Sequence, residues 1–136
     1  MNALTLWRVL FALLLAFVTW QTLTTDPADT EQGFALARLI ADFLFHDEAL
    51  ADKVGHFMAY SALGASAAFS HLRLARRRVL MICALAVYGA LLEFVQGVGG
   101  VRSPEIADAI ANSLGAVLSY PAALALEAAV NRIRSA

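Results

Sequence analysis

Polar residues that could carry out acid–base or metal chemistry stand at regular spacing near the ends of two apolar stretches. Asp52, His56 and Tyr60 are four residues apart, and Glu93 and Gln96 are three apart. Residues at these spacings share one face of a helix. A histidine beside carboxylates can take up and release a proton near neutral pH. The spacing therefore predicts two helix faces that bring titratable groups together.

A third group follows a short link that contains glycine. Asp108 and Asn112 are again four residues apart, and Arg102 precedes them, just before a helix expected to begin at Ile106. An arginine beside a helix N-terminus can hold an anion such as phosphate. The same carboxylates and imidazole could bind a divalent metal, for which the candidates are His56, Glu93 and Asp108. We predict these three as catalytic residues, and as substrate-binding residues Asp52, Tyr60, Gln96, Arg102 and Asn112.

The apolar stretches that would position these groups are long enough to cross a membrane. Hydrophobic types make up 60% of the 136 residues and charged types 15%, whereas soluble domains carry roughly a quarter charged residues. A span needs ~20 residues, and backbone groups in lipid must be satisfied within the segment. We therefore expect an all-α fold, a single domain of residues 1–136 with four transmembrane helices at residues 4–23, 54–72, 79–98 and 106–126.

The first stretch could be either a cleaved signal peptide or a retained helix. The residues after it, Thr24-Thr25-Asp26-Pro27, do not form a small-x-small cleavage site. Trp7 and Trp20 stand where the two membrane interfaces of a retained span would lie. We predict that the helix is retained.

Charge in the links predicts the orientation. Residues 24–52 hold seven carboxylates and one arginine, whereas residues 73–78 hold four arginines and the C-terminal end adds Arg132 and Arg134. Because cytoplasmic links are enriched in Lys and Arg, we expect both termini on the inner side of a plasma membrane and the polar groups near its outer leaflet. Nothing in this pattern indicates nucleic-acid binding, since the basic cluster is a short cytoplasmic link.

Apolar residues recur at helical spacing within the acidic segment, between Phe34 and Leu44. This pattern predicts a helix that lies on the outer membrane surface. A connector packed over the bundle is the alternative. The polar residues also have a second interpretation: Glu93, Gln96, Asp108 and Asn112 could only form interhelical hydrogen bonds. In the same way, Asp52, Lys53 and Arg102 could be interfacial charges that extend toward water.

The sequence resembles the VanZ-like family of small bacterial membrane proteins over residues 52–120. Four motifs in order carry the resemblance: Asp52-Lys53-x-x-His56-Phe57-x-x-Tyr60, Glu93-x-x-Gln96, Arg102-Ser103 and Asp108-x-x-x-Asn112-x-x-Gly115. The family takes its name from a protein linked to low-level resistance to the glycopeptide antibiotic teicoplanin. The resemblance implies an outward-facing site that acts on a phosphate-linked lipid or a lipid-linked cell-envelope precursor, with site positions His56, Glu93, Gln96, Arg102, Asp108 and Asn112.

Three functions are compatible with these residues. The leading hypothesis is an enzyme that hydrolyses or transfers lipid head groups, with His56 as the acid–base or nucleophilic residue. The second is a non-catalytic protein that binds a lipid-linked precursor or an antibiotic. The third is an accessory subunit of a membrane complex, in which the polar residues serve packing alone. The sequence leaves the lipid, the need for a metal and the oligomeric state open.

Overall fold

The computed structural model describes the backbone of residues 2–24, 27–99 and 105–135, and the side chains of these residues except 27–34. The described chain contains no β-strand, so the predicted all-α class is confirmed. Its elements are α1 (Ala3–Leu23), α2 (Pro27–Phe45), the short 3₁₀ helix η1 (Glu48–Leu50), α3 (Ala51–Phe69), α4 (Arg78–Val98) and α5 (Ile106–Ser135).

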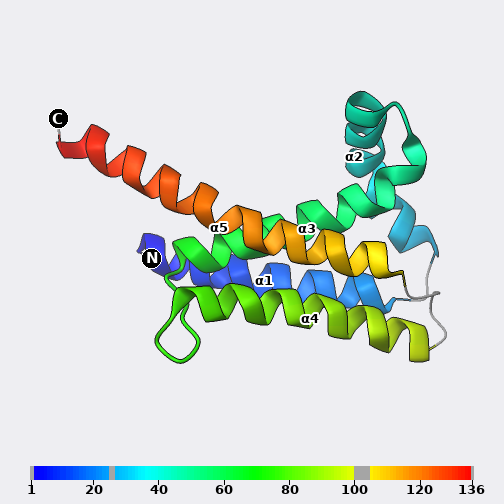
Figure 1. The fold of residues 1–136 in the computed structure, drawn as a ribbon, viewed down its shortest axis with the longest axis horizontal. Coiled ribbons are helices and arrows are strands. Elements are labelled where there is room, and N and C mark those ends of the chain that lie inside the picture. The colour runs from blue at the N-terminus through cyan, green and yellow to red at the C-terminus, as the bar shows by residue number, and fades with distance from the viewer. Residues whose placement is uncertain (1, 25–26, 100–104, 136) are drawn as a thin grey trace.

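Four of the helices lie alongside one another, and α2 stands at one end of this bundle (Figure 1). α3 lies in the middle, where it contacts α1, α2, α4 and α5. Its sequence suits this position, since small residues such as Gly64, Ala67 and Ala68 are buried and let neighbouring helices approach. The helix that begins with Asp52 and His56 therefore has partners on every side.

Within the described residues, three helices are long and apolar enough to cross a membrane: α1, α4 and α5. α3 covers most of the predicted second stretch, but it is not one of these three. Its alanines, glycines and serines, together with Asp52, Lys53 and His56, make it less apolar than α1 and α4. A membrane location of the bundle is thus supported by three helices, and the fourth span stays a prediction.

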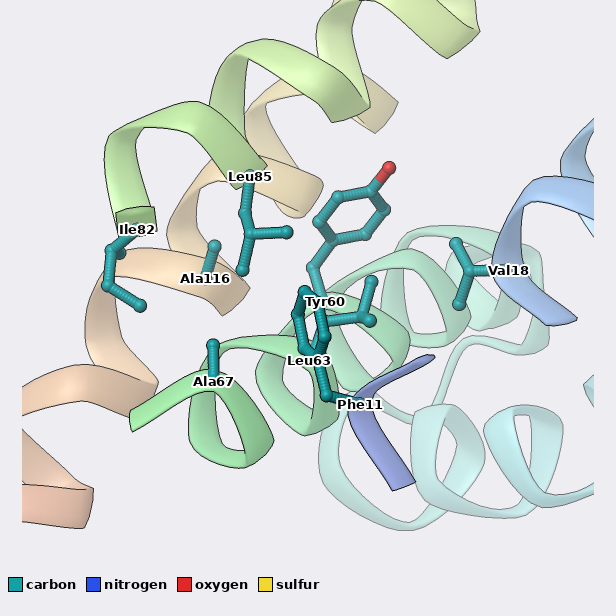
Figure 2. Close-up of a cluster of buried hydrophobic side chains, with 8 residues drawn as sticks. All are labelled: Phe11, Val18, Tyr60, Leu63, Ala67, Ile82, Leu85 and Ala116. Carbon is teal, nitrogen blue, oxygen red and sulfur yellow. The ribbon is translucent and has the colours of Figure 1, made fainter. Parts of the chain in front are cut away.

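The hydrophobic core lies between α1, α3, α4 and α5 (Figure 2). Tyr60, Leu63 and Ala67 from α3 form its centre, and Phe11 and Val18 reach it from α1. The contact between α3 and α5 is especially close. A Cβ atom at Gly64 would lie 2.8 Å from the carbonyl oxygen of Ala116, and one at Gly115 would collide with the carbonyl oxygen of Phe57.

The predicted helix in the acidic segment is present as α2. Its small residues Ala37 and Ala41 are buried, whereas Leu36, Leu39 and Phe43 are exposed by 56%, 67% and 77%. Large apolar side chains therefore point away from the protein, as they would on a helix that meets lipid. Its location on the outer membrane surface stays a prediction.

α5 is longer than the predicted span, because the helix continues beyond Leu126 to Ser135. It passes through Pro121, which cannot donate a backbone hydrogen bond. Its 30 residues rise by about 45 Å at 1.5 Å per residue. The last turns extend beyond the other helices (Figure 1).

Candidate functional site

The predicted polar residues of three helices meet at one end of the bundle. Asp52 and His56 belong to the first turns of α3, Glu93 to the last turns of α4, and Asp108 and Asn112 to the first turns of α5. α3 and α5 start at the same end at which α4 finishes, so turns that are distant in sequence become neighbours. The structure thus brings together five of the eight predicted site residues, namely Asp52, His56, Glu93, Asp108 and Asn112. Together they form the core of a polar cluster at this end of the bundle.

Asn112 links His56 to Glu93. The Nδ1 atom of His56 lies 3.1 Å from Oδ1 of Asn112, and Nδ2 of Asn112 donates a hydrogen bond of 3.3 Å to Oε1 of Glu93. A carboxylate accepts hydrogen bonds, so the amide turns its NH₂ group to Glu93 and its oxygen to the imidazole. The hydrogen-bond pattern therefore assigns the hydrogen of neutral His56 to Nδ1 and the lone pair to Nε2.

Two carboxylates face this lone pair. The Nε2 atom of His56 lies 3.7 Å from Oδ1 of Asp52 and 3.9 Å from Oδ2 of Asp108. These three residues each offer a potential metal ligand, and the ligand atoms lie within 4.8 Å of one another. Glu93 lies on the other side of the ring, 3.6 Å from Nδ1. The grouping that could hold a cation is therefore Asp52, His56 and Asp108, with Asp52 in the place that the sequence assigned to Glu93.

Lys53 joins the same carboxylates. Its Nζ atom lies 3.2 Å from Oδ2 of Asp52 and 3.1 Å from Oδ1 of Asp108, and it also forms an ion pair with Glu105. In the sequence, Lys53 belongs to the motif Asp52-Lys53-x-x-His56, and an interfacial charge is its alternative role. Neither Lys53 nor Glu105 is among the predicted site residues. Residues next to each other in a helix point in different directions, so the spacing gave no sign that Lys53 would reach the partner of His56.

Access to the cluster is graded. The side chains of Lys53, Asp52 and His56 are exposed by 27%, 17% and 12%, whereas that of Asp108 is exposed by 1%. Groups outside the protein therefore reach the imidazole of His56 from the side on which Lys53 and Asp52 lie. The buried Asp108 forms the bottom of the cluster. A reacting group that enters by this route meets the two partly exposed charged residues first.

Tyr60 and Gln96 lie one helical turn beyond His56 and Glu93. Tyr60 is 1% exposed and belongs to the hydrophobic core, where its ring lies against Gly89 (Figure 2). The Nε2 atom of Gln96 donates a hydrogen bond of 2.7 Å to the carbonyl oxygen of Thr22 in α1. Both residues thus contribute contacts between helices. Arg102 lies outside the described residues, and its contact with an anion stays a prediction.

Sequence comparison now adds to this geometry. A model of the VanZ/LLP1 family matches residues 4–127. The chain belongs to the VanZ/LLP1 family. The match confirms the family predicted from four short motifs, and it includes α1, which the motifs did not cover. No curated protein and no solved structure matches the chain.

The part of the chain that the VanZ/LLP1 family model matches includes the cluster. Every described residue of the cluster, from Asp52 to Asn112, lies within the region that the family model matches. The matched region also contains α3, α4 and all of α1 except Ala3.

Proposed function

We propose that this VanZ/LLP1 protein hydrolyses or transfers the head group of a phosphate-linked lipid at the outer leaflet of a bacterial plasma membrane. The observation that carries the proposal is the state of His56. Asn112 and Glu93 hold its Nδ1 side, and its Nε2 atom lies 3.7 Å from the partly exposed Asp52 and 3.9 Å from the buried Asp108. An imidazole held in this way is prepared to accept a proton.

The reaction would use this lone pair as a general base. Nε2 of His56 takes the proton from water or from an acceptor hydroxyl, and the oxygen then attacks the phosphorus atom. The bond from phosphorus to the head-group oxygen breaks, and the imidazolium returns its proton to that oxygen. Asp52 and Asp108 stabilise the imidazolium between these two steps, since opposite charges nearby favour the charged form.

A lipid substrate is supported by an apolar cavity whose lining includes Phe57, the residue that follows His56. A cavity of about 390 Å³ lies between α3 and α5. Its lining is dominated by apolar side chains, among them Phe57, Ala65, Phe69, Leu118, Ala122 and Leu126. α5 is one of the three helices that could cross a membrane, so this cavity suits an apolar chain of a lipid better than a soluble substrate.

The proposal is tested with the full chain in vesicles that contain a panel of phospholipids and polyprenyl phosphates. We expect release or exchange of a head group, and a loss of about 10²–10⁴-fold in rate in His56→Gln, the usual contribution of a general base. His46→Asn serves as the matched control. It removes a histidine of the segment between α2 and η1, and asparagine tolerates the positive φ of 53° found there.

The competing functions give different results in this vesicle assay and in a comparison of the lipids of cells. A protein that only binds a lipid or an antibiotic would retain its ligand in His56→Gln and would show no turnover in any variant. A packing role alone would leave lipid composition unchanged between cells with the gene, without it and with Glu93→Gln. An accumulated lipid in both altered strains would identify the substrate and support the enzyme.

A further inference from the structure

The geometry points to Lys53 as the resident cation of the cluster. We propose that its ammonium group occupies the place that a divalent metal ion would take between Asp52 and Asp108, so that the site works without a metal. Lys53 would then be a positioning residue, because it acts on His56 through the two carboxylates. The activity part of its test rests on the proposed function, and the binding part does not.

In each of the two carboxylates, one oxygen faces Lys53 and the other faces His56. One oxygen of Asp52 lies 3.2 Å from Nζ of Lys53, and the other lies 3.7 Å from Nε2 of His56. In Asp108 the corresponding distances are 3.1 Å and 3.9 Å. The ammonium therefore fixes which oxygen of each carboxylate is turned toward the imidazole. A metal ion that bridged the two carboxylates would fix them in a similar way.

The cluster has an excess of negative charge that such a cation partly neutralises. Its described residues contribute four carboxylates, against which stand one ammonium group and one imidazole. Asp108 is almost fully buried, and a buried carboxylate without a partner is costly. Without Lys53, Asp52 and Asp108 would repel each other. A divalent ion is the natural replacement, because these carboxylates and His56 already have ligand atoms within 4.8 Å.

Glu105 gives Lys53 a further anchor on the open side of the cluster. Its side chain is 45% exposed and forms an ion pair with Lys53. The lysine thus connects the first turn of α3 to the start of α5 at two positions, one exposed and one buried. This double attachment holds the ammonium in the cluster, although its side chain is long and flexible.

The direct test is the binding of Mn²⁺ to the purified full chain in detergent micelles, followed by electron paramagnetic resonance. We expect no saturable binding by the native protein at micromolar Mn²⁺. Lys53→Met should gain a site at least about tenfold tighter than any in the native protein, a difference of one decade in the dissociation constant. Lys53→Arg keeps a cation and should gain none. Lys53→Met combined with Asp108→Asn should lose the new site.

Activity gives a second readout that a purely structural role would not move. Turnover by the native protein should be unaffected by EDTA. That of Lys53→Met should fall, and Mn²⁺ should lower it further, because a metal ion bound at Nε2 of His56 removes the lone pair that accepts the proton. Saturable Mn²⁺ binding by the native protein, or turnover that EDTA abolishes, overturns the proposal even if Lys53→Met fails to fold. Absence of an Mn²⁺ gain in a folded Lys53→Met also overturns it. If no lipid is turned over but the Mn²⁺ gain is found, the enzyme proposal fails and the role of Lys53 stands.

Discussion

The buried amide of Asn112 controls two neighbours at once. It accepts a hydrogen bond from His56 and donates one to Glu93, while its own side chain is only 1% exposed. Both neighbours depend on it: the imidazole for its orientation, and the buried carboxylate for a hydrogen-bond donor. A substitution of Asn112 therefore changes the orientation of His56 without changing the imidazole itself.

Asn112→Leu, which keeps the size of the side chain but removes its polar atoms, tests this control. We expect turnover to fall by about 10²-fold or more, because the base loses its orientation. The stability should fall by roughly 1–3 kcal/mol, because Glu93 loses a buried partner. Steady-state rates and thermal unfolding measure the two effects. Asn131→Leu, at an exposed position of the same helix, is the control, and native turnover in Asn112→Leu would contradict the assigned tautomer.

At the scale of the elements, the crossing of α3 and α5 sets the distance between the two halves of the cluster. Gly64 and Gly115 lie where the backbones are closest, and neither has room for a methyl group. Asp52 and His56 are on one of these helices, and Asp108 and Asn112 on the other. The distance between α3 and α5 at these glycines therefore influences the distance between the polar side chains that the two helices bring to the cluster.

Gly115→Ala shows this dependence, since alanine is ordinarily the better helix former by ~1 kcal/mol. Here we expect the reverse, a loss of about 1–3 kcal/mol from overpacking against the carbonyl group of Phe57. Thermal unfolding in detergent gives the sign. Leu114→Ala, at an exposed position one residue earlier, should have a smaller effect. An increase in stability in Gly115→Ala would mean that the two helices can move apart freely.

The sequence predicted the helices and indicated that the polar faces of three of them meet, but not the individual side-chain contacts. Four-residue spacing placed Asp108 and Asn112 on one helix face, because this signal is local, and the role of these residues in a site stays a prediction. Tyr60 shares a face with His56, yet it lies one turn deeper, where the helix meets the core. The contact of Lys53 with Asp108 depends on the rotation of two helices about their axes, and no local pattern contains that rotation.

For the whole molecule, the main asymmetry is between its two ends. One end carries the carboxylate-rich cluster, α2 and η1, and the other carries the exposed Arg73, Arg76 and Arg77 between α3 and α4. Three helices between these ends are apolar enough for a membrane. Cytoplasmic links of membrane proteins are enriched in positive charge. This arrangement therefore suits a protein whose arginines lie on the cytoplasmic side of the membrane and whose cluster lies on the outer side.

Labelling with a membrane-impermeant maleimide tests this orientation. The native Cys83 is first replaced by serine, and single cysteines are then placed at Ala49 and at Arg76, both exposed. We expect the cysteine at position 49 to react in intact cells, and the one at position 76 only after the membrane is opened. The opposite pattern would place the cluster in the cytoplasm and exclude an outer-leaflet substrate.

One continuous helix joins the cluster to the far end of the chain. α5 begins just before Asp108 and runs without a break to Ser135, although Pro121 lies within it. A protein fused in helical register to its last turn would be carried as a rigid extension. The fused protein would continue the axis of α5, the helix that carries Asp108 and Asn112, so its position would be fixed relative to the cluster. It would therefore serve as a marker in electron cryomicroscopy of a chain of only 136 residues.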